Sequence, residues 1–198
     1  MLDSFFLVGP IPPNAEFGTY NVPRVVISYI VAAFASHTTL LLAYELTTTQ
    51  KSQEQRALRW GGALAMGTGI WSMHFIGMLA YRTTMVIEYD PWLTFLSFLI
   101  AVGAAYCALS LVADERLSGL QILAAGTLLG LAICGMHYTG MAAMKMDADL
   151  RYLPGRFALS VGIGIAASCI ALWLAFTLAR RDRPMRPKSW VRSASTSS

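Results

Sequence analysis

The fold is decided by an apolar stretch that occurs twice, GTGIWSMHFIGMLA at residues 67–80 and GLAICGMHYTGMAA at residues 130–143. The two copies align without gaps and are identical at seven of fourteen positions. Both contain Met-His-x-x-Gly-Met, which is a specific match because the chain has only three histidines. The 63-residue separation of His74 and His137 predicts a parallel internal repeat, in which a helix pair is the unit and both histidine helices run in the same direction.

The composition around these stretches is typical of a polytopic membrane protein. Of 198 residues, 56% are hydrophobic and only 13% are charged, whereas a soluble domain carries about 25% charged residues. An apolar run of about 20 residues crosses a bilayer as a helix. We therefore predict an all-α membrane bundle of five transmembrane helices, and we expect neither a nucleic-acid-binding protein nor a disulfide scaffold. The predicted spans are residues 25–46, 58–81, 92–112, 119–144 and 157–179.

Lysine and arginine residues predict the orientation of these spans. Ten of the 15 basic residues fall on one side of the predicted membrane and five on the other. The positive-inside rule then places the N-terminus outside and the C-terminus inside. We expect residues 1–23 to form an extracytoplasmic segment, residues 24–180 the membrane domain, and residues 181–198 a basic, serine-rich cytoplasmic tail. No basic stretch precedes the short apolar run near the N-terminus, so a cleaved signal peptide is not expected.

Histidine and methionine side chains are the candidate functional groups of the spans. An ionisable residue inside a membrane helix is a functional hypothesis by default. A histidine and a methionine four residues later share one helix face, and the preceding methionine flanks it. Imidazole together with thioether suits copper, especially Cu(I). Zinc would favour thiolate or carboxylate ligands, and haem stays open because histidine and methionine are both axial ligands. The candidate metal ligands are His74, His137, Met73, Met78, Met136, Met141 and His37.

Simpler interpretations of the same residues stay open. A histidine in a membrane helix can bond to a neighbouring helix without holding a metal. His37 lies deeper in its span than the other two histidines and lacks their methionines, so its role as a ligand is the weakest prediction. We find no carboxylate–histidine cluster of di-iron type and no nucleophile–base pair, so the sequence does not predict an enzyme.

The string Met136-His137-Tyr138-Thr139 spells the signature of the MHYT family of bacterial integral membrane sensor domains, which the chain resembles over roughly residues 24–180. The longer strings around both histidines, the Tyr-Asp-Pro at residues 89–91 and the Ala-Leu-Trp-Leu-Ala-Phe at residues 171–176 also resemble this family. Family members commonly carry a third motif and fused signalling modules. By that comparison the chain is expected to be a shortened, stand-alone copy.

The resemblance implies a multi-pass sensor of the bacterial inner membrane. It implies copper held by histidine and methionine near the outer membrane face, and a diatomic gas (oxygen, carbon monoxide or nitric oxide) or the redox state as the signal. The lipid bilayer is then one partner, and a separate cytoplasmic signalling protein or self-association provides the output. The alternatives are a copper-handling or assembly protein, and a structural membrane anchor without metal.

Overall fold

A computed structural model confirms the all-α bundle, and it describes residues 6–7, 9, 18–49, 51–112, 118–146 and 151–181. Five of its helices are long and apolar enough to cross a membrane, and each predicted span falls on one of them. The helices are α2 (Val22–Thr48), α3 (Ser52–Ala80), α4 (Pro91–Val112), α5 (Gly119–Ala142) and α6 (Pro154–Arg181).

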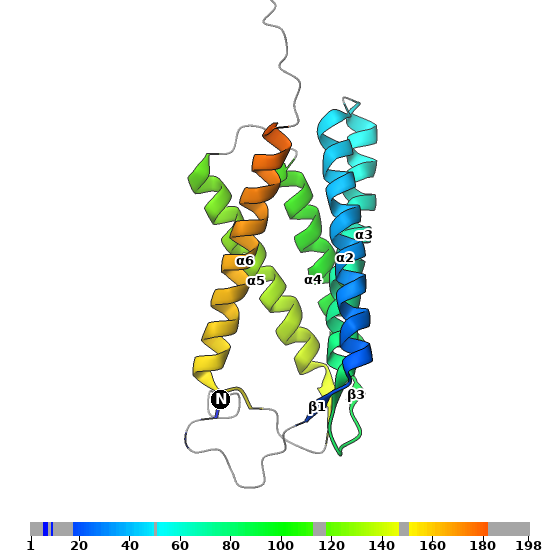
Figure 1. Cartoon of the computed structure of the whole chain (residues 1–198), viewed down its shortest axis with the longest axis vertical. Coiled ribbons are helices and arrows are strands. Elements are labelled where there is room, and N and C mark those ends of the chain that lie inside the picture. Colours follow the sequence, from blue (N-terminus) through cyan, green and yellow to red (C-terminus); the bar gives the residue numbers. More distant parts are fainter. Residues whose placement is uncertain are drawn as a thin grey trace, which may run out of the picture.

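The five helices form a bundle in which each helix packs mainly against the helix before it and the helix after it (Figure 1). Successive helices run in opposite directions, so the two histidine helices, α3 and α5, run in the same direction, as the repeat predicts. The helix α6 ends at the opposite end of the bundle from the start of α2. Below, the end that carries the short strands is the strand end, and the end where α6 finishes is the tail end.

The ends of the helices differ from the predicted spans in ways that have a local cause. Pro91 and Pro154 are the first residues of α4 and α6. Proline suits this position because its fixed φ matches the helix and its missing N–H would have no partner there. The helix α3 begins at Ser52, six residues before the predicted span. Its first turns are polar, so they form helix although an apolar span cannot include them.

Four two-residue strands of the described chain close the strand end, and the sequence does not predict them. The strand β1 (Thr19–Tyr20) pairs with β2 (Tyr81–Arg82), and β3 (Glu88–Tyr89) pairs with β4 (Met144–Lys145), both antiparallel. Tyr81 and Met144 therefore lie in strands, although they were predicted as the last residues of spans. Runs of two residues carry no periodic pattern, so only the folded chain reveals these pairings.

The internal repeat is visible in the helix contacts as well as in the sequence. A Cβ atom added to Gly67 of α3 would lie 2.6 Å from Cα of Val102 in α4. A Cβ atom added to Gly130 of α5 would lie 2.6 Å from Cα of Ile165 in α6. Both residues of the second contact are 63 positions beyond those of the first. The same glycine-to-backbone approach therefore holds both helix pairs together, as expected for small residues at membrane helix interfaces.

An ion pair between Asp90 and Lys145 also stabilises the strand end. Asp90 Oδ1 accepts hydrogen bonds from the backbone N–H groups of Trp92 and Leu93 at the start of α4. Its other oxygen, Oδ2, lies 2.9 Å from Nζ of Lys145 in β4. The hydrogen bond from Lys145, together with that from Leu93, lowers the pKa of Asp90, and Asp90 raises the pKa of Lys145. The carboxylate thus joins the start of α4 to the chain that leaves α5.

We expect this ion pair to make stability depend on pH. A lowered carboxyl pKa contributes stability above the unfolded value of about 3.9, and a raised lysine pKa contributes it below about 10.4. Asp90→Asn keeps a capping oxygen but removes the charge, so it should lower the melting temperature at pH 7 by about 2–4 °C. The difference from wild type should vanish as the pH falls through the lowered pKa of Asp90. Thermal unfolding in detergent from about pH 8 down to about pH 2 measures this.

A matched variant tests whether the charge pair is the cause. In a Lys145→Met background the partner is absent, so Asp90→Asn should change the melting temperature much less. Equal effects of Asp90→Asn in both backgrounds would contradict the assignment.

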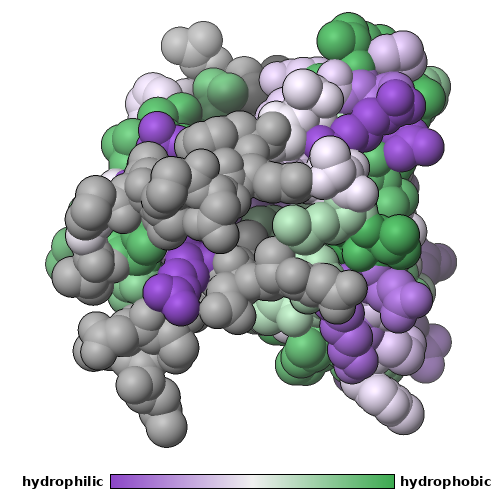
Figure 2. Space-filling model, turned by 90° about the horizontal axis from the view of Figure 1, so that it is seen from below, coloured by the Kyte–Doolittle hydropathy of each residue, from purple (hydrophilic) through white to green (hydrophobic). Residues whose placement is uncertain are grey.

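Hydrophobic side chains cover the flanks of the helices, as a bilayer requires. Figure 2, which looks onto the strand end, shows hydrophobic side chains around the periphery and patches of hydrophilic ones between them. The described part of α2 exposes large apolar residues such as Phe34, which is 71% exposed. Five apolar helices of this length indicate a multi-pass membrane protein. Five of the 15 basic residues that predict its orientation, four of them in the tail, lie outside the described residues, so the orientation stays a prediction.

Candidate metal centre

The two histidines of the repeat meet in the interior of the bundle. Nδ1 of His74 lies 3.4 Å from Nδ1 of His137, and the ring centroids are 4.6 Å apart with planes at 64°. His74 is six residues before the end of α3, and His137 is five residues before the end of α5. At 1.5 Å per residue both rings lie about 8–9 Å inside the strand end. The structure thus brings the two rings to one point on facing helices.

A glycine provides the space for this approach. A Cβ atom on Gly140, one turn beyond His137, would lie 3.4 Å from Nε2 of His74. That same Nε2 is buried and has no hydrogen-bond partner. A buried polar atom without a partner is uncommon in native structures and calls for an explanation such as an ion or a catalytic role. The imidazole of His74 therefore has both of its nitrogens inside the bundle, one facing His137 and one unsatisfied.

The methionines occupy the positions that helix geometry gives them. Met78 and Met141 follow their histidines by four residues, so they share the histidine faces. Met78 is 8% exposed and Met136 is 2% exposed, while Met73 and Met141 are half-buried. The backbone carbonyl of Met73 accepts a hydrogen bond from Ser28 of α2. The role of these sulfur atoms as metal ligands stays a prediction.

His37 is not part of this cluster. It lies on an exposed face of α2, fifteen residues from the start of that helix, which is about 22 Å along the axis. The other two histidines are about 13 Å closer to the strand end by the same geometry. Among the described residues, no group of three histidine, cysteine, aspartate or glutamate side chains comes together. A single site shared by all three histidines, which the sequence allowed, is therefore not formed.

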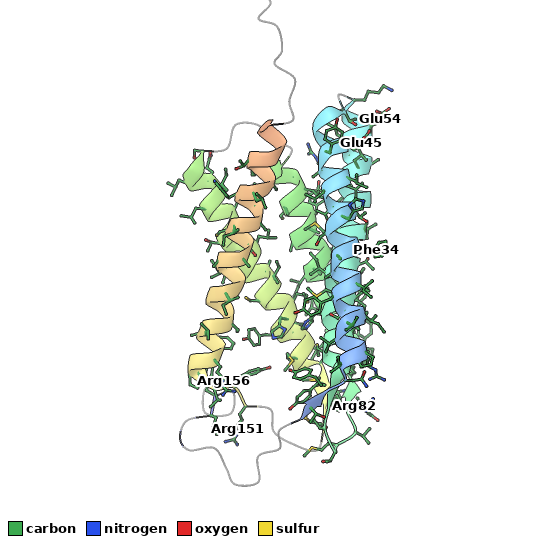
Figure 3. The ribbon with its side chains drawn as sticks, viewed as in Figure 1. Phe34, Glu45, Glu54, Arg82, Arg151 and Arg156 are labelled. Carbon is green, nitrogen blue, oxygen red and sulfur yellow. The ribbon has the colours of Figure 1, made fainter. Side chains whose placement is uncertain are left out.

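A cavity of about 280 Å³, which the sequence does not predict, opens beside His137 at the strand end. Figure 3 shows two of its arginines together below the start of α6. Residues from the end of α5, the following loop and the start of α6 meet here because the two helices are packed neighbours. The lining residues are His137, Tyr138, Arg151, Tyr152, Leu153, Arg156, Phe157 and Ser160.

Hydroxyl groups and aromatic rings order the wall of this cavity. The hydroxyls of Tyr138 and Ser160 are hydrogen-bonded to each other, and Ser160 also donates to the carbonyl of Phe157. The Tyr138 ring packs edge-on against Tyr152 at 5.3 Å. Burial raises the pKa of Tyr152 to about 12, so its phenol is neutral at physiological pH. The cavity therefore offers neutral hydroxyls next to His137, with guanidinium groups near its mouth.

The spacing of the two imidazoles fits a shared metal ion better than a direct hydrogen bond. A separation of 3.4 Å exceeds the usual range of about 2.7–3.2 Å for hydrogen bonds donated by N–H groups. Two metal–nitrogen bonds of about 2.0–2.1 Å that meet at a tetrahedral angle place the nitrogens about 3.4 Å apart. Imidazoles flanked by thioethers suit copper. The residues present therefore fit copper.

Comparisons with known proteins agree with the repeat. The pattern of the MHYT family, described as "Bacterial signalling protein N terminal repeat", matches residues 67–125 and again residues 130–186. The bifunctional diguanylate cyclase/cyclic di-GMP phosphodiesterase MucR of Pseudomonas aeruginosa is 44% identical over 83% of this chain. The cyclic di-GMP phosphodiesterase NbdA of the same organism is 40% identical over 78% of the chain, and the signaling protein YkoW of Bacillus subtilis is 36% identical over 81%.

The alignments cover only part of these relatives. They include 24% of MucR, 19% of NbdA and 20% of YkoW, so the chain spans about a fifth to a quarter of the length of the curated relatives it matches. No solved structure matches the chain. The similarity therefore concerns the membrane repeat rather than the whole relatives.

Proposed function

The chain belongs to the MHYT family of bacterial signalling proteins, and from this premise we propose that it is a membrane sensor whose signal is received by copper between His74 and His137. The observation that carries the proposal is the convergence of two imidazole nitrogens, 3.4 Å apart, from separate helices. We place the protein in the bacterial inner membrane, with the strand end outside.

Each residue of the site has a role that follows from its place. His74 and His137 supply nitrogen ligands, and the sulfur atoms of Met78 and Met141 complete the set from the same helix faces. Gly140 keeps the space around Nε2 of His74 open. Reduced copper held by these residues would supply the affinity for a diatomic gas such as oxygen, carbon monoxide or nitric oxide. The cavity beside His137 gives such a ligand room next to the site.

The same arrangement suggests how a signal crosses the membrane. The helices α3 and α5 pack mainly on α4 and on their other neighbours, and they touch each other little. The histidine pair is therefore a link between two helices that are otherwise held apart. A ligand that prefers one spacing of the two rings over another shifts the packing of α5 against α3. The output then passes to a separate cytoplasmic signalling protein or to a second copy of the chain.

Two other functions compete with this proposal. A copper-handling or assembly protein would need ligands along a path through the membrane, but His37 on α2 lies apart from the pair and exposed. A structural anchor would use the histidines only to hold α3 against α5. The long nitrogen–nitrogen distance favours the metal-binding interpretation over this one.

Carbon monoxide is the probe for the gas-sensing part of the proposal. We expect the reduced, copper-loaded chain to show one carbonyl stretching band in the infrared under carbon monoxide. A His74→Ala/His137→Ala variant treated in the same way should lose at least about 90% of that band, because its copper is lost.

A second variant separates the cavity from the metal. Ser160→Phe fills the cavity beside His137 but keeps both histidines, so copper content should stay unchanged while the carbonyl band weakens. A copper-loaded wild type that shows no carbonyl band would contradict gas sensing and leave copper binding intact.

A further inference from the structure

A second cavity, of about 440 Å³, lies at the tail end of the bundle, where α3 begins and α4 ends. It is at the opposite end from the histidine pair, so the proposed copper site makes no use of it. Its volume falls within the range of about 300–1,000 Å³ that is usual for small-molecule sites. Its lining residues are Ser52, Gln55, Arg56, Arg59, Trp60 and Tyr106.

The cavity is positively charged. Arg56 and Arg59 are three residues apart, so their guanidinium groups belong to neighbouring positions of one helix face. Nε of Arg59 is buried and has no hydrogen-bond partner. The acidic Glu54 does not line the cavity and is bonded to Lys51 at 2.8 Å. A guanidinium is always protonated and only donates hydrogen bonds, so the missing partner of Arg59 is an acceptor.

An aromatic pair forms the other wall. The rings of Trp60 and Tyr106 lie 4.5 Å apart with planes at 34°. Trp60 is nevertheless 53% exposed. Tryptophan and tyrosine are enriched where a membrane helix meets the lipid headgroups. The cavity therefore lies at headgroup depth and has an apolar side and a cationic side.

The internal repeat shows that helix packing does not require these side chains. The positions 63 residues beyond Arg56, Arg59, Trp60 and Tyr106 are occupied by Gly119, Ile122, Leu123 and Cys169. In that second copy Cys169 of α6 still contacts α5, through a hydrogen bond from its Sγ to the Leu123 carbonyl at 3.7 Å. The same helix crossing thus forms with small and apolar residues. Helix packing therefore does not need the arginines and the aromatic pair of the first copy, and these side chains are available to bind a ligand.

We propose that the tail-end cavity binds the phosphodiester headgroup of an anionic phospholipid. Arginine suits phosphate because its planar fork can donate two parallel hydrogen bonds. The Trp60–Tyr106 wall suits the glycerol and upper acyl chain, which a soluble anion lacks. A soluble phosphodiester such as cyclic di-GMP shares the phosphate chemistry, so the experiment must separate the two sources.

Binding of phosphatidylglycerol by the full-length chain tests the proposal. The chain in neutral detergent is titrated with short-chain phosphatidylglycerol, with phosphatidylcholine and with cyclic di-GMP, and native mass spectrometry measures the bound fraction. We expect phosphatidylglycerol to bind about tenfold more tightly than phosphatidylcholine. Arg56→Gln/Arg59→Gln should remove that preference.

A control with the same change of charge guards against a general electrostatic effect. Arg82→Gln/Arg156→Gln removes two arginines at the strand end, far from the cavity (Figure 3), and should keep the preference. An equal loss in this control, or an unchanged preference in Arg56→Gln/Arg59→Gln, would overturn the proposal. Arginine-dependent binding of cyclic di-GMP without binding of phosphatidylglycerol would overturn the lipid assignment. Copper content, measured on the same samples, reports on the metal site separately.

Discussion

Copper is expected to bind the wild-type chain at about one ion per chain and to be lost when both imidazoles are removed. His74→Ala/His137→Ala removes the two nitrogens that lie 3.4 Å apart. Losing one outer-sphere partner of a metal ligand already costs about 10–100-fold in affinity, so losing both nitrogen ligands should exceed about 100-fold. Metal analysis after loading with Cu(I) and desalting measures the change.

Two further variants make the copper result specific. His37→Ala removes the third histidine of the chain, which is exposed on α2, and should leave the copper content unchanged. Met78→Leu/Met141→Leu keeps the side-chain volume nearly constant but removes two sulfur atoms, so it should weaken copper binding with little loss of stability. If the double-histidine variant retains its copper, the metal centre lies elsewhere and the sensor proposal fails.

Adding one methyl group at either repeated glycine is expected to cost about 1–3 kcal/mol of unfolding free energy. In Gly67→Ala the new Cβ atom would lie 2.6 Å from Cα of Val102, and in Gly130→Ala equally far from Cα of Ile165. Backbone atoms cannot rotate away as a side chain can, so the two helices must separate. Unfolding in mixed detergent, followed by circular dichroism, measures both variants.

Glycines on the same helices provide the matched controls. A Cβ atom on Gly61 of α3 or on Gly135 of α5 would meet nothing within 4 Å. Alanine at these positions should leave stability unchanged or raise it by up to about 1 kcal/mol, because alanine is the better helix former. If Gly67→Ala behaves like Gly61→Ala, the close contact between α3 and α4 does not support the fold as the structure indicates.

The sequence predicted much of the candidate site because the repeat places its two histidines at equivalent positions in two helices. The matching frames around His74 and His137 imply equivalent depth in two parallel helices, and the two rings do meet. The cavities were not predictable, because each draws on residues from two helices and the nearest partners are far apart in sequence, as Trp60 and Tyr106 are. The ion pair of Asp90 and Lys145 was missed for the same reason.

The sequence alone determined the membrane class, the five spans and the repeat, because all three depend on local hydropathy and on the recurrence of one motif. Only the tertiary structure decided which histidines meet. His37 shares the residue type of the other two, but it lies on an exposed face of α2, away from the pair. Depth along a helix can be counted in the sequence, whereas contact between helices depends on the glycines that let α3 approach α4, and α5 approach α6, at backbone distance.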